Sequence, residues 1–256
     1  MDTRRERGLF IAGGVCAILW PILSLGFYAA YPIAAGGAMF PQQGGLEAFA
    51  TRLAELGQRP AVVALEWSQA AVPLLLWPFL LALYRLLRQR GQRNLTLVAV
   101  GLGFLGMGLM VFSGTFNATA LHALGQAYVD AGSEAEGAAL LGMLTSLIHW
   151  MRGLNQMSSL LYQGCVGLIG LALIRSRTWR AWGWVGVVGA LLALPAKLPL
   201  GLKVPTNAIW TGLAYYVWPT ALGIGLLRSP RSLPQTSGLE SGILGLAAER
   251  PRGAKK

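Results

Sequence analysis

The chain has 256 residues, of which 54% are hydrophobic and 12% are charged, and its mean hydropathy is +0.53. This composition is too apolar for an ordinary soluble domain and indicates a protein that crosses a membrane several times. The formal net charge of +11 would suit a nucleic-acid partner, but the basic residues lie between apolar segments and at the chain ends. Because no aromatic-basic motif accompanies them, we expect no nucleic-acid partner.

Six apolar segments have the length and composition of membrane-spanning helices. The first is longer than the apolar core of a signal peptide, so we expect it to remain as a helix. The second contains Pro73 and Pro78, which predict a kink, because neighbouring helices or water can satisfy the carbonyls that proline frees. The sequence therefore predicts an all-α membrane protein with six transmembrane helices, at about 8–33, 60–87, 95–131, 137–174, 183–200 and 206–227.

Three further regions have features of their own. The segment 46–57 is amphipathic at helical spacing, which predicts a helix outside the membrane, on its surface or over the mouth of the bundle. The fourth predicted span is too long for one perpendicular crossing, so it either projects beyond the membrane together with the end of the third or breaks near Gly153. The segment 228–256 is rich in Ser, Pro, Gly and charge, and we expect a disordered, basic cytoplasmic tail.

The distribution of basic residues predicts the orientation. Most of the 21 Lys and Arg residues fall on the side of the membrane that holds both termini, which the positive-inside rule assigns to the cytoplasm. The net charge is then a topology signal, with some attraction to anionic membrane lipids. The basic residues on the other side are Arg52, Arg59, Arg152, Lys197 and Lys203.

Both histidines of the chain, His122 and His149, flank a short acidic turn at 132–136. If that turn is the tip of a helical hairpin, they lie at similar depth and could face each other or a common ligand. One hypothesis is therefore a cofactor site, in which the two imidazoles bind a haem iron, another metal or a chlorophyll-type tetrapyrrole. The alternative is that each histidine forms a hydrogen bond within the bundle, which is the commoner role of a lone histidine in a membrane protein.

Four other polar residues lie near the outer ends of their helices: Glu66, Asn117, Arg152 and Asn155. Ionisable groups at membrane depth are costly and indicate a function or a structural pair. We expect an ion pair between Glu66 and Arg152, ahead of a proton relay, or a polar cavity that these residues line. No catalytic motif is present, so no catalytic residue is predicted, and Cys16 and Cys165 lack the spacing of a zinc site.

Part of the chain resembles a known family. The second predicted helix ends in ALYRLLR at 82–88, the third is rich in glycine, and the stretch 164–191 turns through a basic loop and Trp-Gly-Trp into the fifth. This arrangement resembles a bacterial family of six-helix membrane proteins of unknown function. The resemblance covers the second to fifth helices and implies their fold and a bacterial inner-membrane location, without implying an activity.

Three functions fit these observations. A non-enzymatic subunit or accessory protein of a larger membrane assembly is favoured, because catalytic motifs are absent and small residues in the third, fourth and fifth helices would let partner helices approach. A cofactor-binding subunit would use His122 and His149. A small transporter or channel would use the polar outer cavity.

Overall fold

The computed structural model of this chain describes residues 3–37, 45–193, 209 and 212–228, and these form helices and no strand. The predicted all-α class is thus confirmed for the described residues, while the predicted tail and part of the last two predicted spans lie outside them. The elements in chain order are α1 (Thr3–Ala35), α2 (Gly45–Gly57), α3 (Pro60–Ala71), the 3-10 turn η1 (Val72–Leu75), α4 (Leu76–Gln89), α5 (Arg93–Phe116), the π turn η2 (Asn117–Leu121), α6 (His122–Val129), α7 (Glu134–Arg175), α8 (Arg180–Ala193), the π turn η3 (Leu213–Val217) and α10 (Trp218–Arg228).

Four helical stretches are long and apolar enough to cross a membrane, and α8 is a shorter apolar helix. Many large apolar side chains on their outer faces are exposed, such as Ile22, Leu105 and Leu191. So much exposed apolar surface is not stable in water and suits contact with lipid. These features are those of a membrane protein. The four stretches are Glu6–Ala35, Pro60–Gln89, Arg93–Val129 and Glu134–Arg175.

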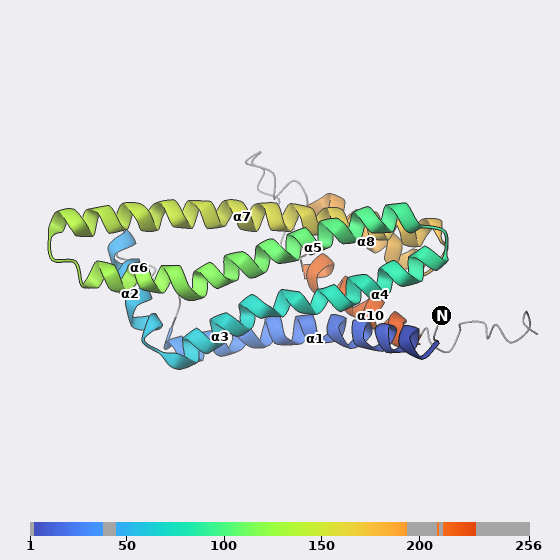
Figure 1. Cartoon of the computed structure of the whole chain (residues 1–256), viewed down its shortest axis with the longest axis horizontal. Helices are drawn as coiled ribbons and strands as arrows, with labels where there is room; N and C mark the ends of the chain where they lie inside the picture. The colour runs from blue at the N-terminus through green and yellow to red at the C-terminus, as the bar shows by residue number, and fades with distance from the viewer. Residues whose placement is uncertain (1–2, 38–44, 194–208, 210–211, 229–256) are drawn as a thin grey trace, which may run out of the picture.

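The helices form an elongated bundle in which α7 runs nearly the full length (Figure 1). At about 1.5 Å per residue, the 42 residues of α7 extend over roughly 63 Å. The hydrocarbon core of a bilayer is only about 30 Å thick. Because α7 continues through Gly153 without a break, the alternative of a break near Gly153 is wrong, and an upright α7 would be longer than the hydrocarbon core.

The predicted kink in the second span is a short 3-10 turn. Pro73 lies in η1, between α3 and α4. Proline has no N–H to donate to the preceding turn and its ring clashes with the carbonyl four residues earlier. The α-helix therefore gives way to one tighter turn and then resumes.

Glycines bring several helices into backbone contact inside the chain. A Cβ on Gly170 would meet Gly183 O at 2.6 Å, and a Cβ on Gly106 would meet Ser158 O at 2.9 Å. These positions join α7 to α8 and to α5, where any larger residue would force the helices apart. In contrast, a Cβ built on Gly101 or Gly108 of α5 would meet no atom of the described part of the chain within 4 Å. The predicted packing glycines thus serve mainly contacts within this chain.

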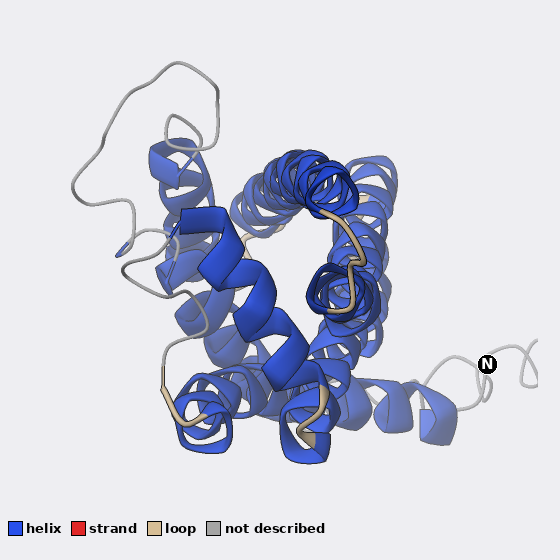
Figure 2. Cartoon of the chain, turned by 90° about the vertical axis from the view of Figure 1, so that its left-hand side faces the viewer, coloured by secondary structure: helices blue, strands red, loops and turns tan. Residues whose placement is uncertain are grey.

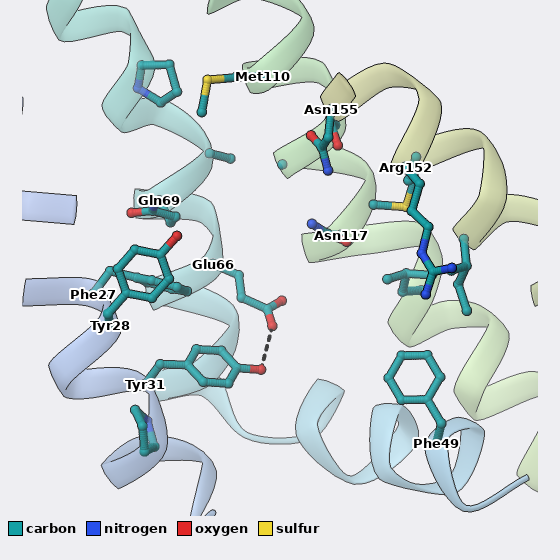
Figure 3. A pocket seen from close by; sticks show the side chains of 18 residues that line it. Phe27, Tyr28, Tyr31, Phe49, Glu66, Gln69, Met110, Asn117, Arg152 and Asn155 are labelled. Atoms are coloured by element: carbon teal, nitrogen blue, oxygen red, sulfur yellow. Dashed lines mark hydrogen bonds between the residues drawn. The ribbon is translucent and has the colours of Figure 1, made fainter. Parts of the chain in front are cut away.

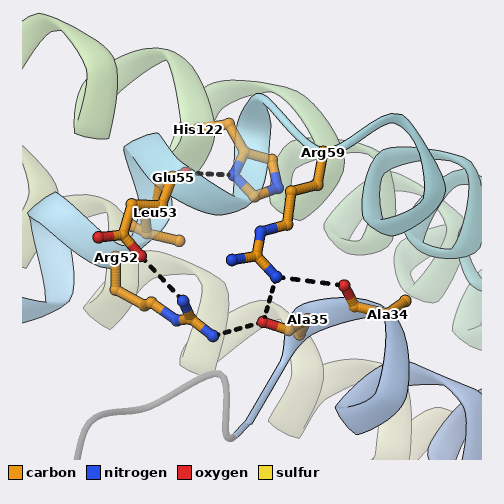
Figure 4. Close-up of polar contacts among 7 residues, drawn as sticks. All are labelled: Ala34, Ala35, Arg52, Leu53, Glu55, Arg59 and His122. Atoms are coloured by element: carbon orange, nitrogen blue, oxygen red, sulfur yellow. Dashed lines mark hydrogen bonds and ion pairs between the residues drawn. The ribbon is translucent and has the colours of Figure 1, made fainter.

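The amphipathic segment forms α2, which crosses one end of the bundle (Figure 2). Its apolar face is buried in a cluster with α6 and α7 that contains Phe49, Leu53, Leu121 and Leu144. Arginines also tie this end to α1: Arg52 and Arg59 donate to the carbonyl oxygen of Ala35, at 2.6 and 2.8 Å (Figure 4). Positive groups at the carbonyl end of a helix are favoured by its dipole and satisfy its free acceptors. The position of α2 is that of a cover over the bundle end.

Candidate functional site

A cavity of about 580 Å³ lies beneath α2, between α1 and α3 on one side and α5 and α7 on the other (Figure 3). Its volume falls in the range of small-molecule sites, about 300–1,000 Å³. All four polar residues singled out in the sequence line it: Glu66, Asn117, Arg152 and Asn155. The structure therefore brings together side chains from three segments that are far apart in the sequence.

On the acidic side of the cavity, Glu66 is buried and both of its carboxylate oxygens are engaged. Tyr31 Oη donates to Oε1 at 3.0 Å, and His122 Nε2 lies 2.6 Å from Oε2. All three side chains are less than one-tenth exposed. A buried carboxylate is costly unless its charge and lone pairs are compensated, and these two partners, from α1 and α6, compensate it.

The other ring nitrogen of His122 determines where its proton lies. Nδ1 is 2.8 Å from the carbonyl oxygen of Leu53 in α2. Because a carbonyl oxygen only accepts, Nδ1 carries a hydrogen. One proton then lies between His122 Nε2 and Glu66 Oε2. If the imidazole binds it, a cation faces a carboxylate, and if Glu66 binds it, both groups are neutral. The pair has no net charge in either case. The interaction also links α2, α3 and α6.

The basic side of the cavity differs, because Arg152 and Asn155 are exposed and no described protein group pairs with the charge of Arg152. Arg152 extends from α7 along the cavity toward Phe49 of α2 (Figure 3). Among the residues that the structure describes, no hydrogen bond or ion pair involves the guanidinium of Arg152 or the side-chain amides of Asn117 and Asn155. A guanidinium and two amides are thus available to a bound molecule.

Two buried polar atoms in the cavity wall also lack partners among the described residues. They are the hydroxyl oxygen of Ser113 and the side-chain oxygen of Gln69, and both residues line the cavity. Ser113 is 2% exposed. Because buried polar groups nearly always form hydrogen bonds, these two atoms are suited to bind a polar molecule or water in the cavity.

The backbone at Asn117 is irregular. Residues Asn117–Leu121 form a π turn between α5 and α6, a rare feature that is concentrated at functional sites. Asn117 is the first residue of this turn. The turn allows one long apolar helix to present Asn117 to the cavity and, one turn later, His122 to Glu66.

Two interactions considered from the sequence are replaced by others. Glu66 pairs with His122 and Tyr31 rather than with Arg152, although Glu66 and Arg152 line the same cavity. The two histidines are in different environments: His122 is buried with both ring nitrogens bonded, whereas His149 is exposed on α7. No nitrogen of His122 is therefore free to bind a haem iron or magnesium. Within the described ranges, no group of three or more His, Cys, Asp and Glu could hold a metal ion.

Sequence reasoning missed three residues of this site: Tyr31, Gln69 and Ser113. Each lies in an apolar segment where a single hydroxyl or amide is common and gives no signal by itself. For Tyr31 a signal was available, because a buried carboxylate such as Glu66 requires donors from a neighbouring helix. The sequence led us to expect the charged Arg152 as the partner of Glu66. Its partners in the structure are the phenol of Tyr31 and the imidazole of His122.

No protein-family model matches this chain, and neither the curated proteins nor the solved structures contain a significant match to it.

Proposed function

We propose that this chain is a small transporter of the bacterial inner membrane, which binds a small molecule in the cavity beneath α2 in one state of its transport cycle. The observation that carries the proposal is the cavity itself, in which Arg152, two free amides and the unpartnered Ser113 and Gln69 meet. Buried polar atoms such as those of Ser113 and Gln69 nearly always form hydrogen bonds, and here they line the same cavity as an arginine and two amides. The apolar helices support the membrane location.

The proposed topology has six spans with both termini in the cytoplasm. The end of the bundle with Glu6, Arg85 and Arg175 would then face the cytoplasm, and the cavity and α2 would lie at the outer end. The excess of basic residues at the first end supports this orientation.

A transporter state fits the interior better than an open channel does. Beyond the cavity, the bundle is filled by a buried apolar cluster that includes Phe79, Tyr162 and Trp218. A channel would need a continuous polar path through this cluster. A carrier that is open toward one side only needs a binding site there, and the irregular turns η1, η2 and η3 offer places where helices can bend.

The test is a thermal-unfolding screen of the purified protein against a library of small solutes and amphiphiles. We expect at least one compound to raise the midpoint of wild-type unfolding by several degrees, because ligands that bind only the native state stabilise it. Ser113→Leu, which fills the cavity wall, should abolish the rise. Ser68→Leu, at an exposed serine of α3 outside the cavity, is the matched control. An equal rise in both variants, or none in the wild type, would contradict the proposal.

A second candidate is a subunit or accessory protein of a larger membrane assembly. The observation that favours it is the outward face of α5, where Gly101 and Gly108 are open beside the exposed Leu97 and Leu105. Small residues on a lipid-facing helix let another helix approach closely. Native electrophoresis in mild detergent tests this role: a partner band should be lost in Gly101→Leu and retained in Leu97→Ala.

A further inference from the structure

We infer that the molecule bound in the cavity is an amphipathic anion, with a carboxylate or phosphate head at Arg152 and an apolar body against α1. This inference rests on the proposed function, because it names the chemical class that the cavity would take. It follows from the charge of the cavity, its free donors and its apolar wall.

Glu66 and Arg152 are the acidic and the basic residue that line the cavity. The negative charge of Glu66 is compensated within the protein, because the contact with His122 holds a proton and Tyr31 donates a hydrogen bond. A cationic ligand would therefore have to displace His122 from Glu66. Arg152 is exposed and has no such partner among the described residues, so no protein group balances the positive charge that it brings to the cavity, and an anion would complement it.

The free donors match the head of such a molecule. A guanidinium offers a planar fork of N–H groups that binds two oxygens of a carboxylate or phosphate. Asn117 and Asn155 add amide donors, and the hydroxyl of Ser113 can turn to donate. An exposed arginine at a membrane surface can also extend into water. Arg152 is exposed too, but its side chain extends along the cavity toward Phe49 (Figure 3), which places its charge where a bound head would lie.

The rest of the wall is suited to an apolar body. The ring of Phe27 in α1 contacts the rings of Tyr28 and Tyr31, with the centroids of Phe27 and Tyr31 5.2 Å apart. On the opposite side, Met110 and Met151 line the cavity. Methionine and aromatic side chains adapt to flexible apolar chains. A fully polar anion would leave this part of the cavity unused.

Probes with the same twelve-carbon chain and different heads test the inference. The protein is placed in nanodiscs of phosphatidylcholine, and saturable binding of tritiated dodecanoate is measured against empty nanodiscs. Dodecanoate, dodecyl phosphate, dodecanol and dodecyltrimethylammonium then compete for the site. We expect the two anions to compete at concentrations at least about tenfold lower than the alcohol or the cation, because hydrogen bonds to charged groups contribute differences of this size.

The decisive variant is Arg152→Gln, which should weaken dodecanoate binding by about 10- to 100-fold and leave dodecanol unchanged. Arg175→Gln, an exposed arginine at the other end of the same helix, should leave both unchanged. Nanodiscs that also contain phosphatidylglycerol distinguish the sources of the anion. Loss of dodecanoate binding in these discs identifies a membrane lipid as the occupant, and retained binding identifies a free amphiphile.

The outcomes separate this inference from the proposed function. If all four heads compete equally and Ser113→Leu abolishes binding, the cavity binds a small molecule but the preference for anions is wrong. If Arg152→Gln weakens all probes alike, the arginine acts on the fold and the inference is again wrong. If no probe shows saturable binding and the solute screen also fails, the proposed function itself is overturned.

Discussion

At the residue scale, the contact between Glu66 and His122 is the interaction on which the outer end of the bundle depends. It joins α3 to α6, and through Leu53 and Tyr31 it reaches α2 and α1. Removing one member of a buried pair is more damaging than losing a surface ion pair, because the remaining group stays buried without its partner. The size of the effect therefore depends on whether a substitute can form the same hydrogen bonds.

Substitutions at Glu66 should separate hydrogen bonding from charge. In Glu66→Gln, the new amide can donate to His122 Nε2 and its oxygen can still accept from Tyr31, so we expect a loss of less than about 1 kcal/mol in the free energy of unfolding. Glu66→Ala leaves both partners unpaired and should lose roughly 3 kcal/mol. Unfolding by SDS in mixed micelles measures both.

Glu55→Ala is the control for this series, because it removes an ion pair with Arg52 in which Glu55 is 54% exposed. Exposed pairs contribute under about 1 kcal/mol, so this variant should be close to wild type. If Glu66→Gln proves as damaging as Glu66→Ala, the charge of Glu66, and not its hydrogen bonds, is essential.

The hydrogen bonds of His122 also lead to a spectroscopic prediction. Both ring nitrogens of His122 form hydrogen bonds, so His122 has no free nitrogen to act as an axial ligand of a tetrapyrrole. His149 is exposed on α7 and does not share its environment. We expect the protein, expressed with a haem precursor and purified in mild detergent, to show no Soret band. A band that disappears in both His122→Ala and His149→Ala would establish the histidine cofactor site and require a different arrangement of α6.

At the element scale, the packing of α2 on α6 covers the cavity. Gly125 of α6 lies against the α2 backbone, since a Cβ there would meet Ala50 O at 2.7 Å and Ala54 N at 2.8 Å. Backbone atoms cannot move aside as a flexible side chain can, so a larger residue must displace the whole helix. Gly57, whose Cβ would meet His122 Cβ at 2.9 Å, shows the same close approach at the end of α2.

Gly125→Val should therefore displace α2 and lower the free energy of unfolding by about 1–3 kcal/mol, the usual cost of overpacking. The matched control is Gly142→Val in α7, a helical glycine whose built Cβ has no atom of the described residues within 4 Å. Both variants introduce the same residue into a helix, so their difference measures the contact itself. Equal stabilities would mean that α2 is not held against α6, and binding of ligand would then not require it as a cover.

At the scale of the whole molecule, the two ends of the bundle differ in their polar contacts. Glu6 at the start of α1 forms an ion pair with Arg85 of α4, whereas the opposite end carries the acidic turn, the cavity and α2. With the topology proposed above, the turn between α6 and α7 faces the outside. Labelling with an impermeant maleimide can locate each end.

For that experiment, Cys16 and Cys165 are replaced by Ser and Ala, and single cysteines are introduced at the exposed Glu134 and Asn94. We expect Glu134→Cys to react in intact cells, and Asn94→Cys to react only after the membrane is permeabilised. The reverse pattern would invert the topology and place the cavity in the cytoplasm. Reaction of both in intact cells would mean that the two ends lie on the same side.

Much of the architecture could be predicted from the sequence, because the relevant signals are local. Apolar runs define the helices, Pro73 marks the irregular turn, and the spacing of Phe49 and Leu53 marks the amphipathic helix. The polar residues Glu66 and Arg152 stand out because they interrupt apolar segments near the same end. These properties depend only on the order of residues along the chain.

The partner of each polar group was decided by the tertiary structure alone. Whether Glu66 meets Arg152 or His122 depends on how each helix is rotated about its axis, and in a bundle of apolar helices that rotation is set by packing between neighbours. Contacts such as those of Gly125 with α2 and Gly106 with α7 determine it here. The sequence by itself determined an all-helical membrane protein with polar groups near one end. The packing of its helices decided that Glu66 pairs with His122, while Arg152 lines the same cavity without an ion-pair partner among the described residues.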